Sequence, residues 1–314
     1  MQIAIIGLGG VGGYFGYKLA HTYSNQEDTV ISFVSRNPTY DIVCQKGLLL
    51  ISPENERETS VHPHIVLEHV QELNSVDLVL ICVKEYDLEN VCRGLKPIVQ
   101  SNTVILPLMN GVDIYERIRT IIHDGIVLPS CVYVASHIKE RGIIVHQGKP
   151  GTIHVGKDPQ SSFLPDDIIV LFNRAEISIQ YQENVLKAIW EKFIFIASFG
   201  LVSGRYNKTI GQILESPELK QKASFVMEEI RSIADHKGFK LHPNFIDLTF
   251  KKAAVFPYHT PTSLQLDIQS KKPKNELALF AGPILKYGKE WGLAVKATEE
   301  IYLEINQIYP NDIK

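Results

Sequence analysis

The chain has 314 residues and a mass of 35.4 kDa, a length typical of about two domains. Hydrophobic residues make up 45% and charged residues 21%, values of an ordinary globular protein that exclude a disordered chain or a disulfide scaffold. The 32 Lys and Arg residues are balanced by 35 Asp and Glu residues, so the net charge of −3 predicts no basic face and no nucleic acid partner.

Cysteine usage and hydropathy indicate a reducing, cytoplasmic setting. The four cysteines are widely spaced and form no C-x-x-C pair, which argues against structural zinc. The N-terminal segment MQIAIIGLGGVGG has no basic region and is broken by glycines, so it is not a signal peptide. No apolar run reaches the length of about 18 residues needed to span a membrane.

One close histidine pair, His62 and His64, could suggest a metal site. Only Glu68 lies near enough in sequence to serve as a third ligand, and no cysteine accompanies the pair. Structural and catalytic zinc sites need at least three protein ligands. A solvated strand is the favoured interpretation, and no metal site is predicted.

Short apolar runs alternate with amphipathic segments in the first half of the chain. Strands are expected at 2–6, 29–34, 77–83, 103–106 and 126–135, and helices at 11–22, 41–46, 87–95 and 113–121. This alternation predicts a mostly parallel sheet covered by helices on both faces. Two inserted hairpins are also expected. The first pairs 48–52 with 59–66 through the polar turn 53–58, and the second pairs 142–146 with 152–155.

After residue 182 the spacing of apolar residues becomes helical. Helices are expected at 184–198, 217–237, 243–254, 275–291 and 298–308, with Pro217 and Pro243 at helix starts. The sequence therefore predicts an α/β fold in which a Rossmann-type domain at 1–182 precedes an all-helical domain at 183–314.

A glycine-rich turn joins the first expected strand to the first expected helix. Its residues are Gly7, Leu8, Gly9, Gly10, Val11 and Gly12. In this context the G-x-G-x-x-G pattern is typical of dinucleotide binding, because the glycines permit a tight turn, a close approach to the pyrophosphate and close helix–strand packing. The helix N-terminus adds N–H donors and partial positive charge. A glycine-rich turn without a ligand is the weaker alternative.

The end of the second strand bears on the choice between NAD and NADP. NAD-binding proteins carry an acidic residue there, which bonds the ribose 2′-hydroxyl. This chain has Val34-Ser35-Arg36-Asn37 instead. Because Arg36 can pair with a 2′-phosphate, NADP(H) is favoured, although Arg36 could also be a plain surface residue.

Lys84 and Asn110 follow two of the expected parallel strands. Open α/β sheets bind ligands at the carboxyl ends of their strands, so both side chains are candidates for a binding site. The alternatives are a solvated lysine and an Asn-Gly turn, since both Asn110 and Gly111 tolerate the left-handed conformation.

Taken together, these features make the sequence similar to the ketopantoate reductase (2-dehydropantoate 2-reductase) family. The similarity extends from residue 1 to about residue 305 and follows the family's order in both domains. The motifs are GLGGVG, VSR with Arg36, CVKEYD with Lys84, LMNGVD with Asn110, AIWEKF with Lys192, TSLQLDI with Ser263, and NELALFAGPILKYGKEWGL with Glu276.

The resemblance implies an activity and a set of site residues. It implies NADPH-dependent reduction of ketopantoate to (R)-pantoate in pantothenate and coenzyme A biosynthesis, in a cleft between the domains. Lys192 would be the catalytic lysine and Glu276 would bond the substrate hydroxyl. Ser263 would bind the carboxylate region, and Asn110 and Lys84 would lie near the nicotinamide ribose and the substrate.

The residue chemistry agrees with the role of Lys192. Hydride delivery to a carbonyl carbon leaves negative charge on the oxygen, and a positioned ammonium stabilises that charge and supplies a proton. The apolar run after Lys192 predicts burial, which a solvated helix lysine does not need. Glu276 could alternatively be an ordinary acid in the first turn of a helix.

The sequence departs from the family pattern at two positions that share a helix face with Lys192. The family has Asn four and eight residues after the lysine, where this chain has Ile196 and Gly200. Loss of each hydrogen bond would weaken binding of a hydroxylated substrate by roughly 1–3 kcal/mol. Two alternatives therefore stay open: reduction of a less polar 2-oxo acid, or a non-catalytic NADPH-binding sensor. The helical domain could also form a homodimer interface.

Overall fold

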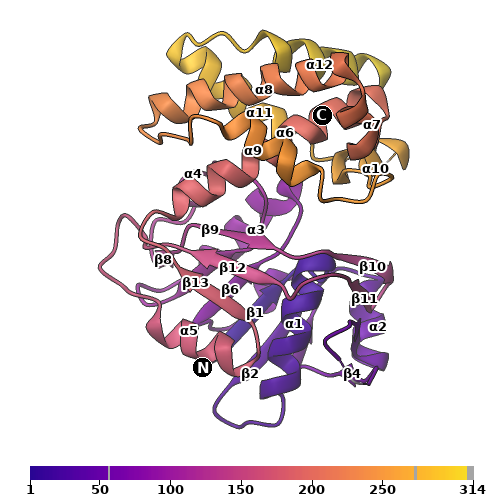
Figure 1. The fold of residues 1–314 in the computed structure, drawn as a ribbon. Helices are drawn as coiled ribbons and strands as arrows, with labels where there is room; N and C mark the ends of the chain where they lie inside the picture. The colour runs from indigo at the N-terminus through magenta and orange to yellow at the C-terminus, as the bar shows by residue number, and fades with distance from the viewer. Residues whose placement is uncertain (56, 272–273, 310–314) are drawn as a thin grey trace. The chain divides into compact units, whose positions relative to one another are not determined.

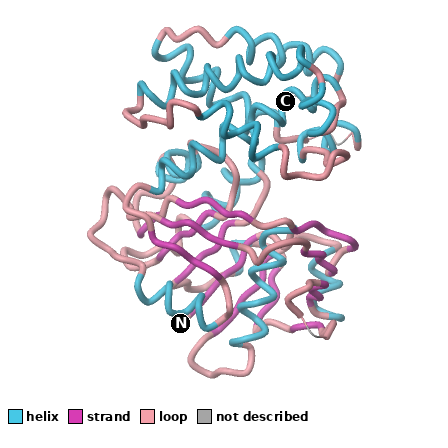
Figure 2. The backbone as a smooth tube through the Cα atoms, viewed as in Figure 1, coloured by secondary structure: helices cyan, strands magenta, loops and turns pink. Residues whose placement is uncertain are grey.

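The computed structural model describes residues 1–55, 57–271 and 274–309. The chain divides into two compact units, Met1–Val185 and Leu186–Lys314. Strands and helices alternate in unit 1, whereas unit 2 is helical (Figures 1 and 2). The expected fold class, a Rossmann-type domain followed by an all-helical domain, is confirmed.

The main sheet of unit 1 has the strand order β5-β2-β1-β6-β7-β8, and every neighbouring pair is parallel. The central strands are apolar on both faces, as expected where helices or further sheets cover both sides of a parallel sheet. The bounds are β1 Gln2–Ile6, β2 Val30–Val34, β5 Ile65–Leu67, β6 Leu78–Ile81, β7 Val104–Pro107 and β8 Ile126–Val127.

Five α-helices and two 3₁₀ turns in the described part of unit 1 connect or cover these strands. They are α1 Gly10–Tyr23, α2 Thr39–Lys46, α3 Leu88–Leu95, α4 Ile114–Arg119, α5 Asp166–Arg174, η1 Val70–Glu72 and η2 Glu85–Asp87. The helix α5 was not predicted from sequence, although its apolar residues Ile168 and Phe172 are buried at helical spacing.

The helix α1 lies against both the main sheet and a second sheet. A Cβ atom added at Gly16 would meet Phe33 at 3.2 Å, and one at Gly13 would meet Ile144 of the second sheet at 2.4 Å. Only glycine leaves room for such close packing on two sides of a helix. The glycines of α1 therefore fix the depth at which its N-terminus sits beside the strand ends.

The remaining strands form two smaller sheets. One has the order β10-β11-β3-β4, and the other has the order β13-β12-β9. The bounds are β3 Leu48–Ile51, β4 Ser60–Val61, β9 Ser130–Tyr133, β10 Ser136–Glu140, β11 Ile143–His146, β12 Thr152–Val155 and β13 Ser178–Tyr181. The strands β10 and β13 were not predicted from sequence.

The hairpin expected from 142–146 and 152–155 is wrong. β11 pairs with β10 and β3, whereas β12 pairs with β9 and β13 in a different sheet. The first hairpin is correct only for β3 and β4, which pair antiparallel. Residue 56 of its expected turn lies outside the described residues.

Two expected strands are each split at a proline. Pro63 separates β4 from β5, and Pro129 separates β8 from β9. In both places the chain leaves one sheet and enters another. Because proline has no N–H to donate to a strand neighbour, it ends a ladder and permits this change of sheet.

Unit 2 consists of helices in its described part. The bounds are α6 Val185–Tyr206 (which begins one residue before the unit), α7 Ile210–Glu215, α8 Pro217–His236, α9 Phe245–Ala253, α10 Ser263–Gln269, α11 Leu277–Trp291 and α12 Lys296–Ile308. Pro217 is the first residue of α8, as expected, whereas α9 begins two residues after Pro243. Among the described residues, no helix has the length and hydrophobicity needed to cross a membrane.

The helix α6 is longer than predicted because its glycines allow close helix packing. A Cβ atom at Gly200 would meet the Phe280 ring of α11 at 3.5 Å, and one at Gly204 would meet Ile268 of α10 at 3.0 Å. Glycine normally weakens a helix interior, but here it lets α10 and α11 approach the α6 backbone. The packing places α6 against the two helices that carry Ser263 and Glu276.

Candidate functional site

The glycine turn lies between the end of β1 and the start of α1. Gly7 has a φ of +91°, which a residue with a side chain rarely adopts, and its Cβ would lie 2.9 Å from the carbonyl oxygen of Cys82. A Cβ at Gly12 would lie 1.9 Å from the oxygen of Gly7. These two glycines therefore hold strand and helix in close contact.

Gly9 is the exception in this turn, because a Cβ added there meets no atom within 4 Å. Gly9 is also the N-cap of α1, where no side chain caps the helix and the first turn carries no acidic residue. The space beside Gly9 at this uncapped helix end is therefore open, and no acid of the first turn offsets the positive partial charge of the helix terminus. This is the arrangement that dinucleotide pyrophosphates bind in Rossmann-type folds.

A pocket of about 660 Å³ opens beside this turn, within the size range of small-molecule sites. Gly7, Leu8 and Gly9 form part of its wall, the segments after β2, β5 and β6 form most of the rest, and Ile138 and Arg141 also line it. Of the residues predicted to bind cofactor, the pocket includes Gly7, Leu8, Gly9, Arg36 and Lys84. It does not include Gly10, Val11, Gly12 and Asn110.

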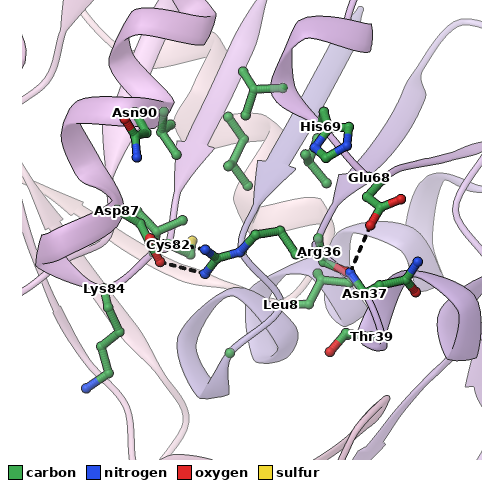
Figure 3. A pocket seen from close by; sticks show the side chains of 18 of the residues that line it. Leu8, Arg36, Asn37, Thr39, Glu68, His69, Cys82, Lys84, Asp87 and Asn90 are labelled. Atoms are coloured by element: carbon green, nitrogen blue, oxygen red, sulfur yellow. Dashed lines mark hydrogen bonds and ion pairs between the residues drawn. The ribbon is translucent and has the colours of Figure 1, made fainter. Parts of the chain in front are cut away.

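Arg36 lies in this pocket at the end of β2, but its guanidinium is already paired. It binds the carboxylate of Asp87 in two contacts, Nη2 to Oδ2 at 2.7 Å and Nη1 to Oδ1 at 3.2 Å (Figure 3). The end of β2 carries no acid in sequence, but η2 supplies one in space. Sequence reasoning missed Asp87, although it belongs to the same CVKEYD motif as Lys84.

A second carboxylate and a buried hydroxyl flank Arg36. Glu68, which follows β5, accepts a hydrogen bond from the backbone N–H of Asn37 at 3.3 Å (Figure 3). Ser35 Oγ is buried and has no hydrogen-bond partner within the described structure. A buried hydroxyl with no partner is uncommon, and Ser35 lines the pocket, so a polar ligand there would satisfy it.

Lys84 and Asn110 both follow strands of the main sheet, as predicted. Lys84 is half-buried at the N-cap of η2, and Figure 3 shows its side chain pointing away from the Arg36–Asp87 pair. Asn110 is half-buried three residues after β7 and precedes Gly111, which has a φ of +119°. Gly111 therefore has the positive φ that the turn interpretation allowed, whereas a binding role of Asn110 stays a prediction.

In unit 2, Lys192 lies on α6 and is half-buried. The next two residues, Phe193 and Ile194, are 1% exposed, so α6 passes through the apolar interior directly after the lysine. An ammonium at such a border loses part of its hydration and interacts more strongly with a neighbouring charge. This position suits a lysine that acts on a developing negative charge.

Glu276 is at the N-cap of α11 and is 6% exposed, but its side chain does not cap the helix. The N–H of Leu277, the first residue of α11, instead donates a hydrogen bond to Oδ1 of Asn275 at 3.0 Å. Glu276 thus lies at the start of a helix, where an acid is common, but it is buried and makes no capping hydrogen bond, so its role stays a prediction. Ser263 is the exposed first residue of α10, where Thr262 caps the helix.

The two departures from the family pattern have different surroundings. Ile196 is half-buried on α6, one turn after Lys192. Gly200 is buried, and the Phe280 ring lies 3.5 Å from where its Cβ would be. The Phe280 ring thus lies in van der Waals contact with the Cβ position of residue 200.

Among the described residues, no cluster of three or more His, Cys, Asp or Glu side chains is arranged to hold a metal ion. His64, one of the close histidine pair, instead accepts a hydrogen bond at Nδ1 from the backbone N–H of Ile31 at 3.1 Å. That contact ties the segment before β5 to β2.

Comparison with known sequences gives matches along the whole chain. The family model described as ketopantoate reductase PanE/ApbA matches residues 3–160, and its C-terminal counterpart matches residues 184–308. A 2-dehydropantoate 2-reductase of Aquifex aeolicus is 26% identical over 309 residues, covering 96% of this chain and 94% of the relative. An uncharacterized oxidoreductase of Bacillus subtilis, YkpB, is 23% identical over 310 residues, covering 98% and 99%.

Solved structures share the fold. A PanE/ApbA family ketopantoate reductase from Ralstonia eutropha superposes with a TM-score of 0.86 at 23% identity, covering 98% of each chain. D-mandelate dehydrogenase, solved with NADH and anilino(oxo)acetate, gives 0.84 at 16% identity, again covering 98% of each chain. A dimeric ketopantoate reductase from Staphylococcus aureus gives 0.79 at 19% identity, covering 99% of each. With both of its halves matched in order by the family models, the chain is an oxidoreductase of the ketopantoate reductase family.

Proposed function

We propose that this chain reduces the ketone of a 2-oxo acid with NADPH, and that ketopantoate is the first candidate substrate. Its product would be (R)-pantoate, an intermediate of pantothenate and coenzyme A biosynthesis. The observation that carries the proposal is a dinucleotide-type turn and pocket in a chain of this family that retains Lys192 and Glu276.

The pocket of unit 1 fits a dinucleotide. Gly9 leaves open space at the uncapped start of α1, and the orphaned Ser35 hydroxyl lines the same pocket. Arg36 would hold the 2′-phosphate of NADPH, and Lys84 and Asn110 would hold the nicotinamide ribose and the substrate. A reduced nicotinamide bound there supplies a hydride to the ketone carbon.

Side chains of the protein would stabilise the negative charge on the ketone oxygen, supply its proton and position the substrate. The Lys192 ammonium would donate a hydrogen bond to the ketone oxygen, stabilise the negative charge that grows there and supply its proton. Glu276 would orient the substrate hydroxyl, and Ser263 would donate to the substrate carboxylate. A homodimer is also proposed, by analogy with the dimeric Staphylococcus aureus relative.

A second candidate substrate is a 2-oxo acid without the hydroxymethyl group of ketopantoate. It is favoured by Ile196 on the face of Lys192 and by Gly200, which has no polar side chain and lies against the Phe280 ring. Apolar groups at these positions leave a substrate hydroxyl without partners, and an unpaired buried hydroxyl costs about 1–3 kcal/mol. D-mandelate dehydrogenase, which has a similar fold, was solved with anilino(oxo)acetate, a ligand without a hydroxymethyl group.

The decisive experiment follows NADPH oxidation by absorbance with ketopantoate, 2-oxoisovalerate, pyruvate and no substrate. We expect turnover of at least one 2-oxo acid, and Lys192→Ala should lower kcat about 10²- to 10⁴-fold because the ketone oxygen loses its acid. The matched control is Lys187→Ala, which removes an exposed lysine of the same helix that pairs with Glu191 at 3.9 Å. Its kcat should stay near the wild-type value.

Each possible result of this assay supports or contradicts one of the proposed functions. Higher kcat/KM for ketopantoate supports the first candidate, and higher kcat/KM for 2-oxoisovalerate supports the second. Equal activity of Lys192→Ala and wild type would contradict the role of Lys192. NADPH binding without turnover of any 2-oxo acid would overturn the reductase proposal in favour of a non-catalytic sensor.

A further inference from the structure

We propose that Asp87 sets the preference between the phosphorylated and unphosphorylated dinucleotides by competing with the 2′-phosphate for Arg36. This inference rests on the proposed dinucleotide function and assigns a specificity-determining residue to it. It starts from the two-contact pair between the Arg36 guanidinium and the Asp87 carboxylate inside the pocket (Figure 3).

The two partners of this pair are held very differently. The side chain of Asp87 is 13% exposed, and its backbone N–H donates to the carbonyl of Lys84 at 3.0 Å in the turn η2. The side chain of Arg36 is 72% exposed and reaches across from the end of β2. The carboxylate is therefore the fixed partner, and the long arginine side chain is the one able to move.

This asymmetry decides what happens when an anion enters. Because Arg36 is so exposed, solvent screens its ion pair with Asp87, and the pair contributes little to stability. A phosphate dianion can therefore replace the Asp87 carboxylate as the partner of the guanidinium. Asp87 cannot withdraw with equal ease, and its charge then stays in the same pocket as the phosphate. Asp87 thus weakens phosphate binding twice, by occupying Arg36 and by repelling the incoming charge.

The same carboxylate favours the unphosphorylated ribose. An acid in this part of a Rossmann-type pocket accepts a hydrogen bond from the 2′-hydroxyl. In the usual arrangement that acid comes from the end of the second strand, whereas here it comes from η2. Arg36 and Asp87 therefore act in opposite directions, and the balance between them sets the cofactor preference.

Glu68 does not share this role in the structure. Its carboxylate contacts the backbone N–H of Asn37 and not the Arg36 guanidinium. Glu68→Gln therefore removes the same charge from the same pocket without releasing Arg36. It separates a general effect of pocket charge from competition for the guanidinium.

The test measures direct binding of 2′,5′-ADP and 5′-AMP by calorimetry, because the two fragments differ only in the 2′-phosphate and need no turnover. Asp87→Asn should tighten 2′,5′-ADP binding about tenfold. The affinity for 5′-AMP should change less than about threefold, since an amide oxygen still accepts a hydrogen bond. In an Arg36→Gln background the gain for 2′,5′-ADP should fall below about threefold, because Asp87 then holds no guanidinium that its replacement could release.

The matched control is Glu89→Gln, which makes the same charge change two residues away. Glu89 pairs with Arg93 at 2.6 Å on the exposed side of α3, and neither side chain lines the pocket. Asp87 accepts no helix-capping hydrogen bond, so Asp87→Asn should keep the wild-type melting temperature.

The outcomes separate this inference from the proposed function. A selective gain for 2′,5′-ADP in Asp87→Asn, absent in Glu89→Gln and smaller in Glu68→Gln, supports the competition. Equal gains for both fragments in Asp87→Asn, or a gain for 2′,5′-ADP in Glu68→Gln or Glu89→Gln as large as that in Asp87→Asn, overturn it while leaving the dinucleotide site intact. Failure of wild type to bind either fragment overturns the dinucleotide site itself, and the 2-oxo acid assay reports independently on the reaction.

Discussion

Gly9 and Gly12 are three residues apart in one turn, yet their surroundings are opposite. The Cβ position of Gly9 is open and lines the pocket, whereas that of Gly12 overlaps the oxygen of Gly7. The G-x-G-x-x-G motif predicts this difference, since it places one glycine beside the pyrophosphate and another at the helix–strand contact. The structure assigns one to the space where a ligand would approach and the other to helix–strand packing.

The first prediction uses this contrast. Gly12→Ala should destabilise the protein by about 2–3 kcal/mol, because backbone atoms must move to admit the methyl group. That corresponds to a melting temperature lower by roughly 4–12 °C for a unit of this size. Gly9→Ala should keep the wild-type melting temperature, because its Cβ has room and its φ of −74° suits alanine.

Binding separates the same two variants. Gly9→Ala should weaken NADPH binding at least about tenfold, because the methyl group occupies the space that the pyrophosphate needs. Thermal unfolding and fluorescence titration of NADPH measure the two effects. Normal NADPH affinity in Gly9→Ala would contradict the placement of the pyrophosphate at this turn.

Residue chemistry in the sequence identified Arg36 but not the group that pairs with it. The end of β2 shows an arginine and no acid, which predicted a phosphate site. Asp87 lies 51 positions further along the chain and meets Arg36 only because β2 and β6 both flank β1. Only the sheet order could reveal this contact.

At the scale of elements, a buried carboxylate ties α4 and β8 to the segment after β12. Asp158 accepts hydrogen bonds from the N–H of Val127 at 2.9 Å and from the hydroxyl of Tyr115 at 2.8 Å, and it pairs with Arg119. Burial opposes its ionisation. The bonds from the Gln160 and Val127 backbone, from Tyr115 and from Arg119 outweigh this and hold the pKa of Asp158 below its ordinary value.

The second prediction concerns this carboxylate. Both carboxylate oxygens of Asp158 accept hydrogen bonds, so in Asp158→Asn the NH₂ group would face a donor in either orientation of the amide. The variant should therefore lose about 3 kcal/mol of stability at pH 7. Because the folded pKa is depressed, the contribution is present at neutral pH and lost as the pH falls below about 4. Urea unfolding should show a constant difference from pH 7 to 5 that shrinks below pH 4.

The exposed Asp124 provides the control for this measurement. Asp124→Asn makes the same charge change in the loop between α4 and β8, where only the backbone carbonyl of Asp124 contacts Arg119. Its unfolding free energy should stay within about 0.5 kcal/mol of wild type. Equal loss in both variants would contradict a specific role of the buried carboxylate.

Periodicity located most strands but could not assign their partners. β11 and β12 have the alternating burial of a hairpin and are close in sequence, yet each pairs with strands of a different sheet. The strand β10 was missed because it is polar and largely exposed, so it has no apolar signal. Pairing depends on hydrogen bonds between distant segments, which a local pattern does not contain.

At the scale of the whole molecule, the third prediction is that NADPH stabilises the protein. A ligand that binds only the native state adds about 2.7 kcal/mol at a hundredfold excess over its Kd. The melting temperature should therefore rise by roughly 5–10 °C for the unit that carries the Gly9 turn. Calorimetry measures the shift, and no shift for wild type at saturating NADPH would contradict a dinucleotide site in unit 1.

Two comparisons sharpen this measurement. Lys192→Ala should show the wild-type shift, since its lysine is assigned to the substrate and not to the dinucleotide. Gly9→Ala should show a much smaller shift at the same NADPH concentration. Together they separate loss of binding from loss of catalysis.

The sequence by itself determined the fold class, the glycine turn and the family, because each depends on local patterns. Strand and helix periods, a G-x-G-x-x-G after a strand, and ordered motifs around Lys84, Asn110, Lys192 and Glu276 are all readable along the chain. Only the tertiary structure decided which strands share a sheet, that the Phe280 ring lies against Gly200, and that Asp87 holds Arg36. These contacts join residues far apart in sequence, and they form only when long-range packing and hydrogen bonding bring the elements together.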